Sequence, residues 1–387
     1  MKRLAQLFLV VSVSFLAGAL WFRHQMPPFK QLREVYVVLM NRAPEDHPAR
    51  PEQLIKFELP ASADLSIERL TYLYDQLRDV AFSQNPQISV LNQGSMDPFE
   101  VGAKNTDIYE AKLAFGCASK IYLFHPKSQS ARQNSLFIFH QGHHGMWTPN
   151  LHLIKALLHA EFHVAAFQMP FRGENACNFD FDDQRTGTIN VKKHKNFQLV
   201  PMFHEQTGIH PLSFFLAPLQ SFINFADQEL GFDEYYMAGI SGGGWTTTVY
   251  SAIDRRIRTA FSIAGDAPYS WNAIQENFGD YEEMFMLNLG SYYELYILDV
   301  LNGNEFNRNK YNLYNSFDRC CFQSFKFDLS SLQDAVNRTI ERLGGDQDSD
   351  HFQIREFDNK EHSITDEMVA FIVEHASGPA SKPAQAE

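Results

Sequence analysis

The sequence predicts an α/β fold with a mostly parallel central sheet that helices cover on both faces. Short apolar segments alternate along the chain with longer segments whose apolar residues recur at helical spacing. Several of the short segments, such as 136–140, are apolar throughout. Strands have this composition when helices cover both sides of a parallel sheet. With 387 residues, the chain has room for insertions and accessory segments around one such sheet.

The predicted sheet domain runs from residue 109 to residue 377. We expect its strands, separated by polar or glycine-containing turns, at 109–115, 120–125, 136–140, 163–168, 234–239, 257–264, 311–314 and 352–357. We expect its helices at 150–159, 211–230, 245–254, 330–343 and 367–375.

Two insertions, 174–210 and 268–309, interrupt this alternation. They are expected to form caps because of the family resemblance that the catalytic motifs carry. Both are rich in aromatic residues. Because most large apolar side chains are buried in cores, we expect these aromatics mainly to pack the insertions onto the sheet rather than to line a substrate tunnel.

Residues 1–25 are expected to be a signal peptide or a membrane anchor. A basic start precedes a nearly charge-free apolar run, 4–22, that is just long enough to span a bilayer. The small residues 17–19 offer a cleavage site, but cleavage there would leave an apolar terminus, which slightly favours an uncleaved anchor. Basic residues flank the run on both sides, so its orientation stays open. We therefore expect a membrane-anchored or exported protein.

Residues 26–108 are expected to form an N-terminal helical accessory region. Segments 30–41 and 65–81 have helical apolar spacing, and a linker rich in proline and charge, 43–51, lies between them. At the other end of the chain, the tail 378–387 is rich in proline, alanine and serine and is expected to be disordered.

Charge and cysteine content limit the partners of the protein. The formal net charge of −13 argues against a nucleic-acid partner, which would require a basic face. Cys117 and Cys177 can pair in an oxidising compartment if their distance allows it, whereas the neighbours Cys320 and Cys321 rarely bridge comfortably. For all four, a role as small buried apolar residues is the favoured expectation.

Ser241 lies at the apex of a G-x-S-x-G pattern between an apolar strand and a helix start. Such a turn forces the serine into a strained backbone conformation, and small residues at Gly239 and Gly243 keep the neighbouring segments from clashing. The hydroxyl then projects beyond the strand end, and the amide of Gly242 points to where an oxyanion would form. Because short motifs match by chance, the pattern alone also fits a glycine-rich loop with a serine cap.

Reactive residues follow three other predicted strands, in the loop 141–145 and in the turns that hold Asp318 and His362. Binding sites in parallel sheets lie beyond the carboxyl ends of the strands. Together with the serine turn, this order resembles the α/β-hydrolase family, in which the nucleophile precedes an acid and then a histidine. The resemblance spans roughly 109–375 and implies the catalytic set Ser241, Asp318 and His362.

A serine hydroxyl is a weak nucleophile at neutral pH, so it requires a base and a third group that orients the base. His362 follows the last predicted strand, where the resemblance places the base, and His351 precedes that strand and is a weaker candidate. Asp318 is in the usual position of the acid. Asp266, which follows the preceding strand, is the alternative acid.

The loop 141–145 (Gln-Gly-His-His-Gly) resembles the oxyanion loop of this family, usually His-Gly-x-x-Gly, although Gln141 stands where histidine is common. The resemblance implies that the amides of Gly242 and His143 stabilise the oxyanion. A metal site is an alternative interpretation of three nearby histidines, His140, His143 and His144. No carboxylate or cysteine motif accompanies them, so we expect no bound metal. The resemblance to serine hydrolases also implies no organic cofactor.

The favoured function is that of a serine hydrolase that cleaves an acyl bond, in the first instance a carboxylic ester, through an acyl-enzyme. A peptidase or amidase of the same fold is the alternative within this class. A non-catalytic binding module at the membrane and a metal-dependent hydrolase are alternatives from other classes. The expected partners are a small-molecule or acylated substrate and, through the N-terminal segment, the membrane.

Overall fold

The computed structural model describes residues 65–377, apart from 97, 129–131, 270, 272–279, 287–288, 303–304 and 346–350. The chain divides into two units, Met1–Gln53 and Leu54–Glu387, and every described residue belongs to the second. The expected signal peptide or anchor, the expected helix 30–41 and the expected tail lie outside the described residues. Within the described ranges, no helix is both long and apolar enough to cross a membrane.

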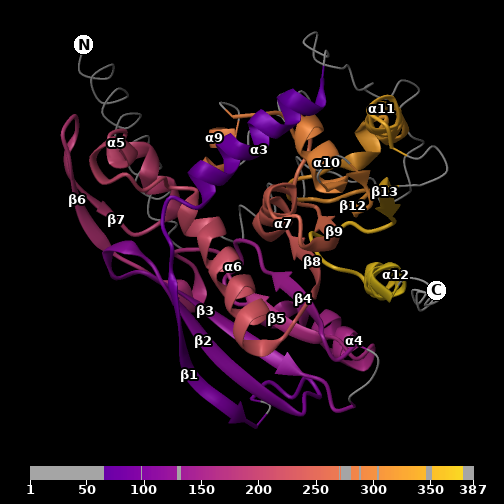
Figure 1. The fold of residues 1–387 in the computed structure, drawn as a ribbon, viewed down its shortest axis with the longest axis horizontal. Helices are drawn as coiled ribbons and strands as arrows, with labels where there is room; N and C mark the ends of the chain where they lie inside the picture. The colour runs from indigo at the N-terminus through magenta and orange to yellow at the C-terminus, as the bar shows by residue number, and fades with distance from the viewer. Residues whose placement is uncertain are drawn as a thin grey trace, which may run out of the picture. The chain divides into compact units, whose positions relative to one another are not determined.

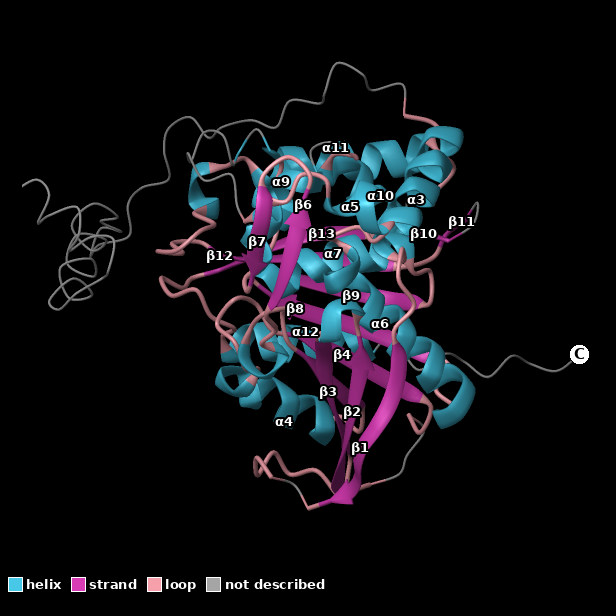
Figure 2. Cartoon of the chain, turned by 90° about the vertical axis from the view of Figure 1, so that its left-hand side faces the viewer, coloured by secondary structure: helices cyan, strands magenta, loops and turns pink. Residues whose placement is uncertain are grey.

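A mixed sheet forms the centre of the fold and confirms the predicted α/β architecture. Its nine described strands have the spatial order β1-β2-β3-β5-β4-β8-β9-β12-β13, and Figures 1 and 2 show how they follow one another. Neighbours from β5 to β13 are parallel, whereas β1, β2, β3 and β5 pair antiparallel. The strands are β1 (Gln87–Ser95), β2 (Asn105–Lys112), β3 (Ala118–His125), β4 (Ser135–His140), β5 (His163–Phe167), β8 (Glu234–Ile240), β9 (Ile257–Ile263), β12 (Asn309–Asn315) and β13 (Phe352–Phe357).

The predicted strands are all present, most with ends within a residue or two of the prediction, and the largest difference is at β2. The sequence does not predict β1. The residues of β1 are mostly exposed, so the segment lacks the buried apolar pattern by which a strand is recognised. The sheet therefore begins inside the stretch 26–108 that the sequence assigns to an accessory region.

Helices cover both faces of the sheet. One face carries α6 (Ser213–Phe225), α7 (Gly242–Ile253), α10 (Tyr292–Val300) and α11 (Leu329–Arg342), with α3 (Ile67–Ala81) against α6 and α7. The other face carries α4 (Leu151–His159) and α12 (Asp366–Ser377), which lie together in Figures 1 and 2. Alternate residues of β4 divide between the two cores, because Leu136 and Ile138 belong to the first and Phe137 and Phe139 to the second.

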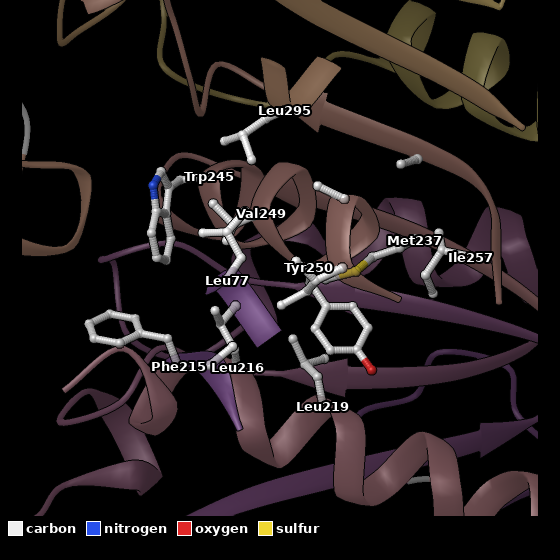
Figure 3. Close-up of a cluster of buried hydrophobic side chains, with 14 of the residues drawn as sticks. Leu77, Phe215, Leu216, Leu219, Met237, Trp245, Val249, Tyr250, Ile257 and Leu295 are labelled. Carbon is white, nitrogen blue, oxygen red and sulfur yellow. The ribbon is translucent and has the colours of Figure 1, made fainter. Parts of the chain in front are cut away.

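Every residue of α7 is buried. Figure 3 shows Val249 of α7 close to Leu77 of α3, with Trp245 above Phe215 of α6. The rings of Trp245 and Phe215 meet edge to face, with centroids 5.6 Å apart. This packing fixes the start of α7, which is also the turn that presents Ser241.

The first insertion, 174–210, contains the hairpin β6 (Phe179–Asp183) and β7 (Gly187–Val191) followed by α5 (Phe203–Thr207). The second, 268–309, contains α9 (Tyr281–Met286), α10, β10 (Leu301–Asn302) and β11 (Glu305–Phe306). Aromatic residues of the first insertion pack against one another and onto α6, as expected. The rings in this cluster include Phe179, Phe181, Phe197, Phe203 and Phe214.

The expectation that the four cysteines serve only as small buried apolar residues is wrong, because the structure contains no free thiol among the described residues. Cys117, in the turn between β2 and β3, forms a disulfide with Cys177 of the first insertion, with Cα atoms 5.3 Å apart. Cys320 and Cys321 are also joined. Sixty positions separate the first pair in sequence, and only the fold brings them together.

The first prediction concerns this cross-link. Replacing both Cys117 and Cys177 by alanine should lower the free energy of unfolding by about 2–4 kcal/mol, because the bridge restricts a long loop of the unfolded chain. Denaturant titration of the full-length chain, with and without a reducing agent, measures the effect. The Cys320→Ala/Cys321→Ala variant is the control, and it should keep most of the sensitivity to reduction. Equal stability of wild type and the Cys117/Cys177 variant would show that the bridge is not formed.

The second prediction concerns His210, which is buried just before α6. Nδ1 of His210 accepts a hydrogen bond of 3.1 Å from the amide of Leu212, which requires an unprotonated nitrogen. Burial, together with the neighbouring His204, lowers the pKa of His210 to about 3. Because this pKa is below that of the unfolded chain, the contribution to stability is complete above about pH 6.5 and is lost as the pH falls.

When the pH falls from about 7.5 to 5, protonation of this histidine in the unfolded chain should therefore lower the free energy of unfolding by about 2 kcal/mol. The variant His210→Gln should lose correspondingly less over that range in urea titrations followed by tryptophan fluorescence. His159→Gln, at an exposed position of α4, is the matched control and should follow wild type. The explanation fails if all three proteins lose stability in parallel.

Candidate active site

Four strand ends bring the predicted site residues to one edge of the sheet. The loop 141–145 follows β4, Ser241 follows β8, Asp318 follows β12 and His362 follows β13. These strands run parallel, so their carboxyl ends point the same way. A cavity of about 220 Å³ opens at this edge. The lining of this cavity includes Gln141, Gly142, His143, His144, Ser241, His362 and Ser363.

Ser241 has φ 58° and ψ −130°, a conformation that non-glycine residues rarely adopt. A Cβ atom on Gly239 would overlap the carbonyl oxygen of Gly243, and one on Gly243 would overlap the carbonyl oxygen of His140. The predicted need for glycine at both positions is therefore confirmed. The amide of Ser241 donates a 2.9 Å hydrogen bond to the carbonyl of Ile263, which holds the turn against β9.

The loop after β4 runs directly over this turn. A Cβ atom on Gly142 would lie 2.6 Å from the Cβ of Ser241 and 3.1 Å from the nitrogen of Gly242. One on Gly242 would lie 2.5 Å from Cε1 of His143, so the imidazole covers the first residue of α7. Gly142 and the amide at the start of α7 thus lie side by side next to the serine.

Gln141, which stands where the family loop commonly has histidine, stabilises the loop 141–145 through hydrogen bonds of its side chain. The side chain of Gln141 is buried, donates to the carbonyl of Met146 at 3.1 Å and accepts from Nδ2 of Asn150 at 2.9 Å. The amide of Gln141 also donates to the carbonyl of Phe167 at 3.1 Å. An amide side chain can donate and accept at once, so one residue braces both ends of the loop. Asn150 has no sequence signal that marks it for this role.

His362 and Asp318 are joined by a hydrogen bond of 2.6 Å, in which Nδ1 of the imidazole donates to Oδ2 of the carboxylate. Asp318 is fully buried, and Oδ1 accepts from the amides of Cys320 at 2.7 Å and Cys321 at 3.3 Å. Both carboxylate oxygens are therefore occupied and directed. In the described part of the chain, Nε2 of His362 is buried without a hydrogen-bond partner.

Backbone hydrogen bonds tie the two loops that carry this pair. The backbone amide of Phe317 donates to the carbonyl of Asn359 at 3.0 Å, and the backbone amide of Arg319 donates to the carbonyl of Lys360 at 3.1 Å. Nδ2 of Asn315 donates to the carbonyl of Ser363 at 3.0 Å. The acid loop and the histidine loop are thus held as one unit, which fixes the orientation of the imidazole.

Asp266, the alternative acid, is engaged elsewhere. The carboxylate of Asp266 accepts from the hydroxyls of Thr248, Ser262 and Tyr296 and from Nδ2 of Asn312. The structure therefore joins His362 to Asp318 and not to Asp266. His351, the alternative base, precedes β13 and has Nδ1 directed to the carbonyl of Arg308 at 3.2 Å.

The histidines 140, 143 and 144 do not form a common cluster. His140 is buried, which lowers the pKa of the imidazole to about 4, and Nδ1 donates to the carbonyl of Gln141. His143 instead turns to the insertions, where Nε2 lies 3.0 Å from Oε1 of Glu282 and 3.3 Å from Oδ2 of Asp280.

His194 of the first insertion joins His143, Asp280 and Glu282 in one group, because Nε2 of His194 lies 3.6 Å from Oε2 of Glu282. Burial lowers the pKa of His143, but Glu282 and Asp280 outweigh this and raise it above the usual value. Sequence reasoning missed the group because its members come from three distant segments.

Residues 219–318 match the family model described as PhoPQ-activated pathogenicity-related protein, which covers well under half of the chain. No curated protein matches the sequence.

Among solved structures, methylesterase BT1017 is similar with a TM-score of 0.55 and 12% identity, over 79% of this chain and 62% of that one. An acetyl xylan esterase from Paenibacillus sp. R4 is similar with a TM-score of 0.49 and 12% identity, over 83% of this chain and 96% of that one. Acetyl xylan esterase 1 from Thermoanaerobacterium sp. JW/SL YS485 has a TM-score of 0.48 and 15% identity, over 82% and 99% of the two chains.

The parallel strand order, the strained serine turn and the structural match to the methylesterase lead to one conclusion: the chain has the α/β-hydrolase fold.

Proposed function

We propose that the chain is a serine hydrolase that cleaves a carboxylic ester through an acyl-enzyme intermediate. The observation that carries this proposal is the 2.6 Å hydrogen bond between His362 and Asp318, which leaves Nε2 of the imidazole without a partner in the described structure. His362 and the strained Ser241 line the same cavity. A nucleophile, a base and an oriented acid in this order are the parts that acyl transfer requires.

In the proposed reaction, Oγ of Ser241 attacks the acyl carbonyl while Nε2 of His362 takes the hydroxyl proton. Asp318 accepts from Nδ1 of His362 and stabilises the imidazolium that forms. The amides of Gly242 and His143 stabilise the tetrahedral oxyanion. His362 then gives the proton to the departing alcohol, and a water activated by the same imidazole releases the acyl group from Ser241.

An ester is favoured over a peptide or amide for two reasons. The similar structure of the same fold is named a methylesterase, so this scaffold accommodates ester cleavage. The cavity of about 220 Å³ also falls below the usual 300–1,000 Å³ of drug-sized ligand sites, which favours a compact acyl group. A peptidase of the same fold and a non-catalytic module are the alternatives that the following experiments address.

We further propose that the domain lies in an oxidising compartment, exported or tethered by the N-terminal segment. The Cys117–Cys177 disulfide supports this, because such bonds persist mainly outside the reducing cytosol.

The third prediction tests the nucleophile. The full-length chain should label with a fluorophosphonate probe, and Ser241→Ala should abolish labelling, because Ser241 is the proposed nucleophile and lines the same cavity as the proposed base His362. Ser363→Ala is the matched control, since this second hydroxyl lines the same cavity, and it should keep labelling. Gel fluorescence of the labelled proteins, with circular dichroism to check folding, provides the measurement. A folded wild type that does not label would remove the hydrolase proposal and favour a binding module.

The fourth prediction separates the two acids. Asp318→Asn should lower kcat for a p-nitrophenyl acyl ester by about 1,000-fold or more, because the asparagine no longer selects the productive tautomer of His362. Asp266→Asn should instead lower the melting temperature and leave most of the activity of the folded fraction. His351→Gln should have little effect on kcat. The opposite ranking of the two aspartate variants would reassign the acid.

A further inference from the structure

The group formed by His143, His194, Asp280 and Glu282 contains four side chains that can each offer one ligand atom, and these atoms all lie within 4.8 Å of one another. His143 comes from the loop after β4, His194 from the first insertion, and the two carboxylates from the start of α9 in the second insertion. Local sequence therefore does not explain why they meet. Their convergence is a property of the folded chain.

Three separations in the group are close to those around a four-coordinate ion, with His143 and His194 facing different oxygens of the Glu282 carboxylate. Bonds of about 2.1 Å in a tetrahedral site place neighbouring ligand atoms about 3.4 Å apart. The measured separations are 3.0 Å between Nε2 of His143 and Oε1 of Glu282, 3.3 Å between His143 and Oδ2 of Asp280, and 3.6 Å between Nε2 of His194 and Oε2 of Glu282.

Hydrogen bonding does not satisfy this group. Glu282 is fully buried, and neither oxygen of its carboxylate has a hydrogen-bond partner in the described structure. Nε2 of His143 lies within ion-pair distance of Oε1, at 3.0 Å, but makes no aligned hydrogen bond in the described structure. A buried carboxylate without donors is costly, and a cation is the group that relieves this cost.

We propose that His143, His194, Asp280 and Glu282 bind one divalent transition-metal ion of the zinc class. Two imidazoles with two carboxylates suit this class, whereas magnesium and calcium favour oxygen ligands alone. Two carboxylates and two neutral imidazoles carry a charge of −2, which the ion balances. The side chain of Asp280 is 49% exposed, so the ion reaches the site from solvent on this side.

The ion has a structural role at this position. Of the four ligands, His143 alone belongs to the lining of the cavity that contains Ser241. The ion therefore faces the insertions and does not contact the acyl carbonyl. It fastens both insertions to the loop whose backbone lies over the serine turn. This assignment departs from the sequence-based expectation of no bound metal.

The test uses full-length, metal-free protein in detergent, titrated with zinc chloride by isothermal calorimetry. Wild type should bind one zinc ion per chain, and Glu282→Gln and His194→Gln should each weaken binding by at least about 100-fold, since even partners behind the ligands are worth about 10–100-fold. Glu283→Gln is the matched control, because it makes the same change at the next, also buried position of α9 and should retain binding.

Cobalt substitution of wild type provides a readout that needs no variant. A single bound cobalt ion should give the strong visible bands of a four-coordinate site with mixed nitrogen and oxygen ligands. Zinc should also raise the melting temperature of wild type and of Glu283→Gln but not of Glu282→Gln. The proposal is overturned if wild type shows no such bands, or if zinc binds wild type and Glu282→Gln with equal affinity. The group would then be an imidazolium–carboxylate pair. Both readouts are independent of ester hydrolysis.

Discussion

The strained backbone at Ser241 is the constraint on which the surrounding structure depends. A residue held at φ 58° and ψ −130° costs about 1–3 kcal/mol and persists only where its neighbours leave no alternative. Here the glycines on either side touch other backbone directly, so the turn cannot relax outward. The helix that follows is buried at every residue, so the turn cannot relax by moving α7 either. The serine is therefore presented by rigid elements, as a reactive group must be.

A buried polar network holds α7 from the side that faces β9 and β12. Thr248 of α7 donates to Asp266 and accepts from Nζ of Lys310 at 2.5 Å. Lys310 also lies 3.2 Å from Asp299 of α10, and both side chains are fully buried. Burial raises the pKa of Asp299 to about 6, despite the ammonium beside it. Apolar contacts with α6 position α7 from one side, and this network adds directional bonds from another. This network occupies Asp266, while Asp318 remains directed to His362.

Features marked by a local pattern in the sequence are predicted well, whereas features that depend on contacts between distant segments are not. The strands of the sheet centre are apolar over several residues, so they are predicted well. β1 is exposed and polar, so no hydrophobic pattern marks it. The glycines around Ser241 are predictable from the sequence, because a larger residue at either position would clash with the neighbouring backbone. The choice between Asp318 and Asp266 depends on which carboxylate is free to meet His362, and this is decided by partners such as Tyr296 and Asn312, distant in sequence. The disulfide between Cys117 and Cys177 depends on distance in the same way.

His143 shows why the cap and the chemistry are best considered together. The ring of His143 covers Gly242, where we propose that the oxyanion forms, and the preceding residue Gly142 lies directly over the serine turn. The far side of that ring meets Glu282 of the second insertion, with His194 of the first insertion on the other carboxylate oxygen. Any displacement of either insertion therefore acts on the ring and, through it, on the loop backbone. The cation that neutralises Glu282, whether an imidazolium or a metal ion, therefore influences the position of the His143 ring and of the loop 141–145. In this fold the insertions thus contact the proposed site through the ring of His143, although the lining of the cavity contains no described residue of either insertion.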